Sequence, residues 1–71
     1  MLKEHDVVTV KVDLPGSGLS AGDVGAIVHC YTDRDAYEVD FVDERGQAKG
    51  VVTLPGSRLL RLNLSSLLAA S

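Results

Sequence analysis

The stretch AYEVDFV, residues 36–42, has the clearest strand pattern in the chain. Its apolar side chains alternate with acidic ones, and this period of two is typical of a strand with one buried face. The next residues, 43–47, read DERGQ, and Gly46 stands where a hairpin loop needs positive φ after a type I turn. The stretch therefore predicts a strand followed by a β-hairpin. The side chains expected to face the core are Tyr37, Val39 and Phe41.

Four more segments have strand composition, and turn residues separate them about every ten positions. These segments are residues 7–14, 24–31, 49–54 and 58–62. Five short strands with regular turn signals predict a small all-β barrel. No helical pattern longer than a turn or two precedes residue 63, so α/β nucleotide-binding folds are disfavoured. We expect a barrel domain over residues 1–62 and a separate tail over residues 63–71.

The segment GLSAGDVGAIVHCY, residues 18–31, contains the end of the longest connection and the whole second strand. Leu19 is a single apolar residue among turn residues, so we expect it to anchor the loop to the core. Gly22 and Asp23 form the turn, and Gly25 indicates a β-bulge or a close approach by another segment. A phosphate-binding loop is disfavoured, because these glycines precede a strand rather than a helix and no Gly-Lys-Ser/Thr ending follows.

The tail NLSSLLAAS differs in composition from the rest of the chain. Leu64, Leu67 and Leu68 have the i, i+3, i+4 spacing of one helix face, and Asn63 or Ser65 can cap such a helix. Nine residues are too few to hold a helix alone in water. The leucines are therefore candidate binding residues, and three alternatives stay open: they dock on the barrel, on another copy of the chain, or on nothing.

Cysteine and histidine content limits disulfides and metal sites. Cys30 is the only cysteine, so no intrachain disulfide can form, and a lone thiol favours a reducing, cytoplasmic location. Its position within a strand predicts a buried structural thiol. With His5 and His29 it provides too few ligands for tetrahedral zinc, and we expect no metal and no cofactor. We also expect no signal peptide and no membrane segment, because no long apolar run is present.

Charge and side-chain chemistry narrow the function classes. Seven basic side chains are scattered among ten acidic ones, for a net charge of −3, which disfavours nucleic-acid binding. No set of residues fills the roles of an active site, so we expect no enzyme. His29 is interpreted as an ordinary strand residue whose face stays undecided. Tyr31, beside Arg34 and Asp35 of the TDRD turn, is the predicted partner-binding edge, because Tyr and Arg are common interface anchors.

Five pieces of sequence carry a family resemblance. They are Asp6 to Val8, VDLP at 12–15, GLSAGDVGAIVHCY at 18–31, AYEVDFVDERG at 36–46 and VTLPGSRLLRL at 52–62. Together they resemble a family of short bacterial and archaeal proteins called domain of unknown function 4926. The resemblance implies an SH3-like barrel with no established activity and no assigned catalytic residues. The chain is similar, more loosely, to KOW-type SH3-like barrels, whose Gly-x-x-Gly turn enters a strand, and the tail departs from the family pattern.

We expect a non-catalytic interaction module that binds a protein partner, which can be a second copy of the chain. A first alternative is a KOW-like module that binds nucleic acid through basic residues gathered by folding. Those residues are Lys3, Lys11, Lys49, Arg58 and Arg61. A second alternative is a small-molecule binder that uses a cleft between two subunits.

Overall fold

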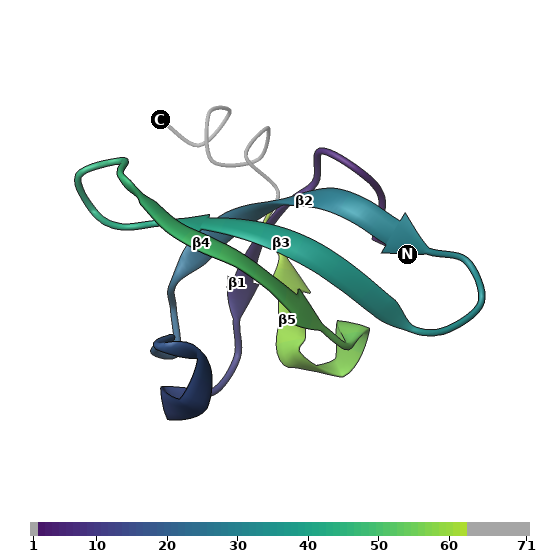
Figure 1. Ribbon diagram of the computed structural model, residues 1–71, viewed down its shortest axis with the longest axis horizontal. Helices are drawn as coiled ribbons and strands as arrows, with labels where there is room; N and C mark the ends of the chain where they lie inside the picture. Colours follow the sequence, from purple (N-terminus) through teal and green to yellow (C-terminus); the bar gives the residue numbers. More distant parts are fainter. Residues whose placement is uncertain (1, 63–71) are drawn as a thin grey trace.

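The computed structural model describes residues 2–62 and contains five strands (Figure 1). The strands are β1 (Val7–Val10), β2 (Val24–Tyr31), β3 (Ala36–Val42), β4 (Ala48–Leu54) and β5 (Leu59–Arg61). Two 3-10 turns, η1 (Pro15–Ser17) and η2 (Gly56–Arg58), lie in the connections before β2 and β5. The prediction of an all-β fold is confirmed. The predicted tail, with Leu64, Leu67 and Leu68, lies outside the described residues.

The strands form one antiparallel sheet in the order β4-β3-β2-β1-β5. The two end strands, β4 and β5, do not pair with each other, so the sheet is open and the prediction of a closed barrel is wrong. The reason lies in the connection between them. After Leu54 the chain passes through η2 and enters a β5 of only three residues, which pairs with β1. β5 thereby joins the sheet beside β1, at the opposite end from β4, and no ladder connects the two end strands.

The sheet is curled around its core. In Figure 1, β1 and β5 cross behind β3 and β4 at a steep angle. Buried side chains from both groups of strands meet between them and form a single cluster. The members of this cluster are Val8, Val10, Leu19, Ile27, Val39, Phe41, Leu54 and Leu59. Val39 and Phe41 are fully buried as predicted, whereas Tyr37 is half-buried and packs against the cluster.

The first strand is shorter than predicted. Only Val8 and Val10 of its apolar residues enter the core, and Val12 is 38% exposed. The reason is that, after Val10, the backbone bonds to the loop before β2 and no longer to β2 itself: the Val10 carbonyl accepts a hydrogen bond from the Gly22 N–H at 2.9 Å. The long connection then folds back on itself, because Leu14 forms a bridge with Leu19, which is 3% exposed.

The β-bulge of β2 does not lie at Gly25, where the sequence allowed one. The β2–β3 register shifts between Ile27 and His29, so that Val28 has no partner in β3. Gly25 instead satisfies the alternative prediction of a close approach. A Cβ atom at this position would stand 2.6 Å from the Asp40 carbonyl oxygen, which is closer than carbon and oxygen atoms approach without displacement.

Candidate functional site

The bulge at Val28 decides which side chains β2 presents to solvent. Ile27 is fully buried, and with strict alternation His29 and Tyr31 would follow it into the core. The extra residue moves Cys30 to the inner side instead, where it is half-buried, packs against the core and pairs with Tyr37. His29 is exposed and Tyr31 half-buried on the opposite, outer face. The face of His29, undecided from the sequence, is therefore the outer one.

Four side chains gather on this outer face at the end of β2. The Arg34 guanidinium carbon lies 4.5 Å from the centroid of the Tyr31 ring, within the range of cation–π attraction. The His29 ring meets the same tyrosine edge-on, with 4.6 Å between centroids and 83° between ring planes. The Tyr31 hydroxyl donates a hydrogen bond to the Glu38 carboxylate. These four residues, from β2, the following turn and β3, are called the Tyr31 cluster below.

The charges around Tyr31 keep its phenol protonated. The Glu38 carboxylate accepts the hydrogen bond and would repel a phenolate, so the pKa of Tyr31 is raised above its ordinary value of 10.0. Arg34 acts in the opposite direction but is the weaker influence. Its side chain is 59% exposed, and its guanidinium lies 3.8 Å from the Asp33 carboxylate. The cluster thus combines an aromatic ring (Tyr31), a partly exposed guanidinium (Arg34) and a hydroxyl–carboxylate hydrogen bond on one face of the sheet.

Of the predicted binding residues, Tyr31 and Arg34 come together, whereas Asp35 lies elsewhere. An Asp35 carboxylate oxygen stands 2.7 Å from the place a Cβ atom of Gly56 would take, so this side chain lies against η2. The sequence interpretation missed His29 and Glu38. Counting back from the turn would have found them, because a regular hairpin that pairs Tyr31 with Ala36 also sets His29 opposite Glu38.

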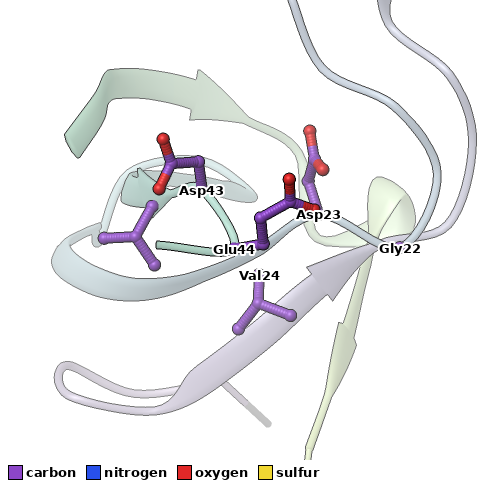
Figure 2. A pocket seen from close by; sticks show the side chains of 6 residues that line it. Gly22, Asp23, Val24, Asp43 and Glu44 are labelled. Atoms are coloured by element: carbon purple, nitrogen blue, oxygen red, sulfur yellow. The ribbon is translucent and has the colours of Figure 1, made fainter. Parts of the chain in front are cut away.

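A shallow depression of about 300 Å³ lies at the other end of β2 (Figure 2). Its lining residues are Gly22, Asp23, Val24, Val42, Asp43 and Glu44. Figure 2 shows three carboxylates around it, from Asp23, Asp43 and Glu44. Two of these carboxylates already have partners within the protein. Their contacts decide what the depression can bind.

Asp23 binds the Lys49 ammonium at 2.8 Å and accepts the Ser20 N–H at 2.9 Å, and these contacts lower its pKa. Asp43 accepts the backbone N–H groups of Arg45 and Gln47 at 2.8 and 2.9 Å. These hydrogen bonds hold the loop before β2 and the β3–β4 turn in place. Within residues 2–62, no group of three or more His, Cys, Asp or Glu side chains is arranged to hold a metal ion. The acidic depression is therefore interpreted as part of the loop architecture.

The predicted turn residues have the backbone geometry that their sequence positions require. Gly22 has φ of 96° and Gly46 has φ of 81°, a region that other residues rarely adopt. Leu19 lies in the core beneath the loop that contains η1.

The basic residues named for nucleic-acid binding are partly engaged with acids. Lys49 pairs with Asp23, and the Arg61 guanidinium lies 3.5 Å from the Asp6 carboxylate. These pairs reduce the cationic surface available for phosphates. Among the described residues, no helix is both long enough and apolar enough to cross a membrane.

One comparison with known proteins shows the family of the chain. A family model described as Domain of unknown function (DUF4926) matches residues 4–61, most of the chain. The protein belongs to the DUF4926 family. The family resemblance inferred from the sequence is thus confirmed, and the match includes every strand and the whole Tyr31 cluster of this DUF4926 protein. No curated protein and no solved structure matches the chain.

Proposed function

We propose that this protein is a non-catalytic interaction module that binds a protein partner through the Tyr31 cluster. The observation that carries the proposal is the stacking of Arg34 on Tyr31, with His29 against the same ring. Tyr and Arg are the residue types that most often anchor protein interfaces. A ring and a guanidinium that already hold each other lose less side-chain freedom on binding, which favours affinity.

The position of the cluster supports the same role. Tyr31 is the last residue of β2 and Glu38 lies within β3, so two paired strands hold the tyrosine from both its backbone and its hydroxyl. Arg34 projects from the turn between them. Binding residues on a turn that a sheet holds rigid are a common arrangement for recognition.

The proposal includes two finer statements. The curled, open sheet is an SH3-like arrangement, supported by its five antiparallel strands in the order β4-β3-β2-β1-β5 and by the loose sequence similarity of the chain to KOW-type barrels. The module is non-catalytic; in keeping with this, the raised pKa of Tyr31 keeps its phenol protonated, so the hydroxyl of the Tyr31 cluster acts as a hydrogen-bond donor and not as a nucleophile.

The experiment is affinity capture from host extract with the full chain, followed by direct binding of each purified partner. We expect Tyr31→Ala and Arg34→Ala each to weaken that binding about tenfold or more. Arg45→Ala is the matched control, because Arg45 is an exposed arginine in the other hairpin turn. Thermal melts verify that each variant is folded. Partners that bind Tyr31→Ala as tightly as the unaltered chain, or a chain that captures no partner, would refute the proposal.

A further inference from the structure

We infer that the tail, residues 63–71, docks on the outer face of its own sheet and places its leucines against a row of apolar side chains there. This inference goes beyond the proposed function. The surface lies on the same face as the Tyr31 cluster but before the bulge of β2, whereas the cluster lies after it. Three observations carry the inference: the strand register, the place where β5 ends and the chemistry of the tail.

Strand register lines up apolar side chains across the outer face. Val8 and Val10 of β1 are buried on the inner face, so the residues that alternate with them face outward. The pairs of a first outward row are Leu60–Thr9, Thr9–Val24 and Val24–Val42, and the pair Val7–Ala26 begins a second row. The apolar members of these two rows are called the outer band, and they are Val7, Val24, Ala26, Val42 and Leu60.

The outer band is open to solvent at both ends. Leu60 in β5 is 53% exposed and Val42 in β3 is 37% exposed, while the members between them are half-buried. Thr9, the polar residue of the first row, already donates its hydroxyl to the Asp23 carbonyl at 2.9 Å. Beside Val24 the surface is hollowed into the depression of about 300 Å³ (Figure 2). A contiguous apolar row of this kind indicates a surface that another segment covers.

The chain leaves β5 beside this band. The Leu62 N–H donates a hydrogen bond to the Val7 carbonyl at 2.8 Å, so the residue before the tail is held next to β1. Nine residues follow it. As a helix they would span about 14 Å, at about 1.5 Å per residue, and this length equals about three strand spacings of about 4.8 Å. The tail is thus long enough to cross from β5 over β1 and β2 to β3.

The tail has the composition of a covering segment. Leu64, Leu67 and Leu68 have the spacing of one helix face, and a nine-residue helix needs a surface to be stable in water. NLSSLLAAS contains no charged residue, so like-charge repulsion does not keep it from the acidic rim of the depression. Because Asp23 and Asp43 of this rim are bound within the chain, the valines are the groups that an incoming side chain contacts.

The covalent connection favours the tail's own sheet over a second copy. A segment joined directly to β5 meets the outer band at an effective concentration on the order of millimolar, whereas the tail of another copy meets it only at the concentration of the protein. In dilute solution we therefore expect the contact to form within one chain.

The test is methyl NMR of the full 71-residue chain at about 0.1 mM, below the effective concentration of a tethered segment. We expect nuclear Overhauser effects from the Leu67 and Leu68 methyl groups to those of Val7 and Val24. A mixture of isotope-labelled and unlabelled chains should show no such effects between copies.

Two variants at equally exposed valines test the location. Val42→Asn puts a polar group in the outer band and should raise the ratio of undocked to docked tail about fivefold, because an apolar contact is lost. Val12→Asn is the matched control and should leave the ratio unchanged, since Val12 is 38% exposed but lies in the loop after β1, outside the band. Amide chemical shifts of the tail report the ratio. Leu67→Asp, which puts a charge among the tail leucines, provides the undocked reference.

Three outcomes would overturn the inference. Tail methyl groups without effects to the outer band in the full chain do so, and so do effects found only between copies. Equal responses to Val42→Asn and Val12→Asn also do so, because the tail then contacts another surface. The two proposals fail separately: Tyr31→Ala should leave the tail contacts unchanged, and Leu67→Asp should leave partner binding through the Tyr31 cluster unchanged.

Discussion

The two halves of β2 have opposite roles. Before the bulge, Gly25 and Ile27 face inward, Gly25 against the β3 backbone and Ile27 within the core. After the bulge, His29 and Tyr31 face outward and form the Tyr31 cluster with Arg34 and Glu38. One unpaired residue, Val28, separates the two halves. The contrast shows how an inserted residue lets one strand build the core at one end and present a cluster of polar and aromatic side chains to solvent at the other.

The largest effect is expected in the inward half. Ile27→Ala removes most of a fully buried side chain, so we expect the free energy of unfolding to fall by about 2–5 kcal/mol. Val28→Ala alters the next residue, which is 47% exposed, and should change stability by no more than about 0.5 kcal/mol. Urea denaturation measures both. Similar losses of stability in the two variants would contradict the burial of Ile27 and the exposure of Val28.

Gly25→Ala should have the next largest effect. Its new Cβ atom would meet the Asp40 carbonyl at 2.6 Å and a Val39 methyl at 2.8 Å, and relief requires β2 and β3 to move apart. We expect a loss of about 1–3 kcal/mol. Gly16→Ala is the matched control, because nothing lies within 4 Å of its added methyl group and no loss is expected. Equal stability of the two variants would show that β3 can move away from the added methyl group with no loss of folding free energy.

Deletion of Val28 tests the boundary between the halves. It removes the residue without a β3 partner and joins the pair Ile27–Val39 directly to the pair His29–Glu38. We expect a folded protein that loses less stability than Gly25→Ala and keeps both faces of β2. Nuclear Overhauser effects between the His29 and Tyr31 rings measure whether the cluster survives. Their loss in a folded deletion variant would mean that the bulge also shapes the cluster.

The smallest effect concerns pH and the outward half. Because the folded-state pKa of Tyr31 is raised above 10.0, its contribution to stability is complete below that pH and disappears as pH rises through the folded pKa. Glu38→Gln removes the carboxylate, so we expect Tyr31 to titrate at lower pH than in the unaltered chain. Ultraviolet absorbance of the phenolate follows the titration, and Tyr31→Phe assigns the signal. An unchanged titration in Glu38→Gln would show that Glu38 is not what raises the pKa of Tyr31.

Alternation predicted the bounds of β3 and the burial of Val39 and Phe41, because period-two burial is a local property of a strand, and β-branched composition predicted the bounds of β2. The same pattern was wrong for residues 11–14, where alternation continues but the chain has already entered the loop around η1. Of the candidate site, Tyr31 and Arg34 were predicted from residue type and their place beside a turn. His29 and Glu38 were missed: the hairpin register sets them opposite each other, but the bulge decides that they face outward.

The sequence by itself determined where β2 and β3 lie, which turns need glycine, and that Leu19 is available to anchor the long loop. These properties follow from neighbouring residues, through strand alternation and the backbone conformations that glycine allows. Only the tertiary structure decided the position of the bulge, the outward face of His29 and the open order that leaves β4 at one edge. Each of these depends on how distant strands pair, and pairing is settled by the packing of the whole core.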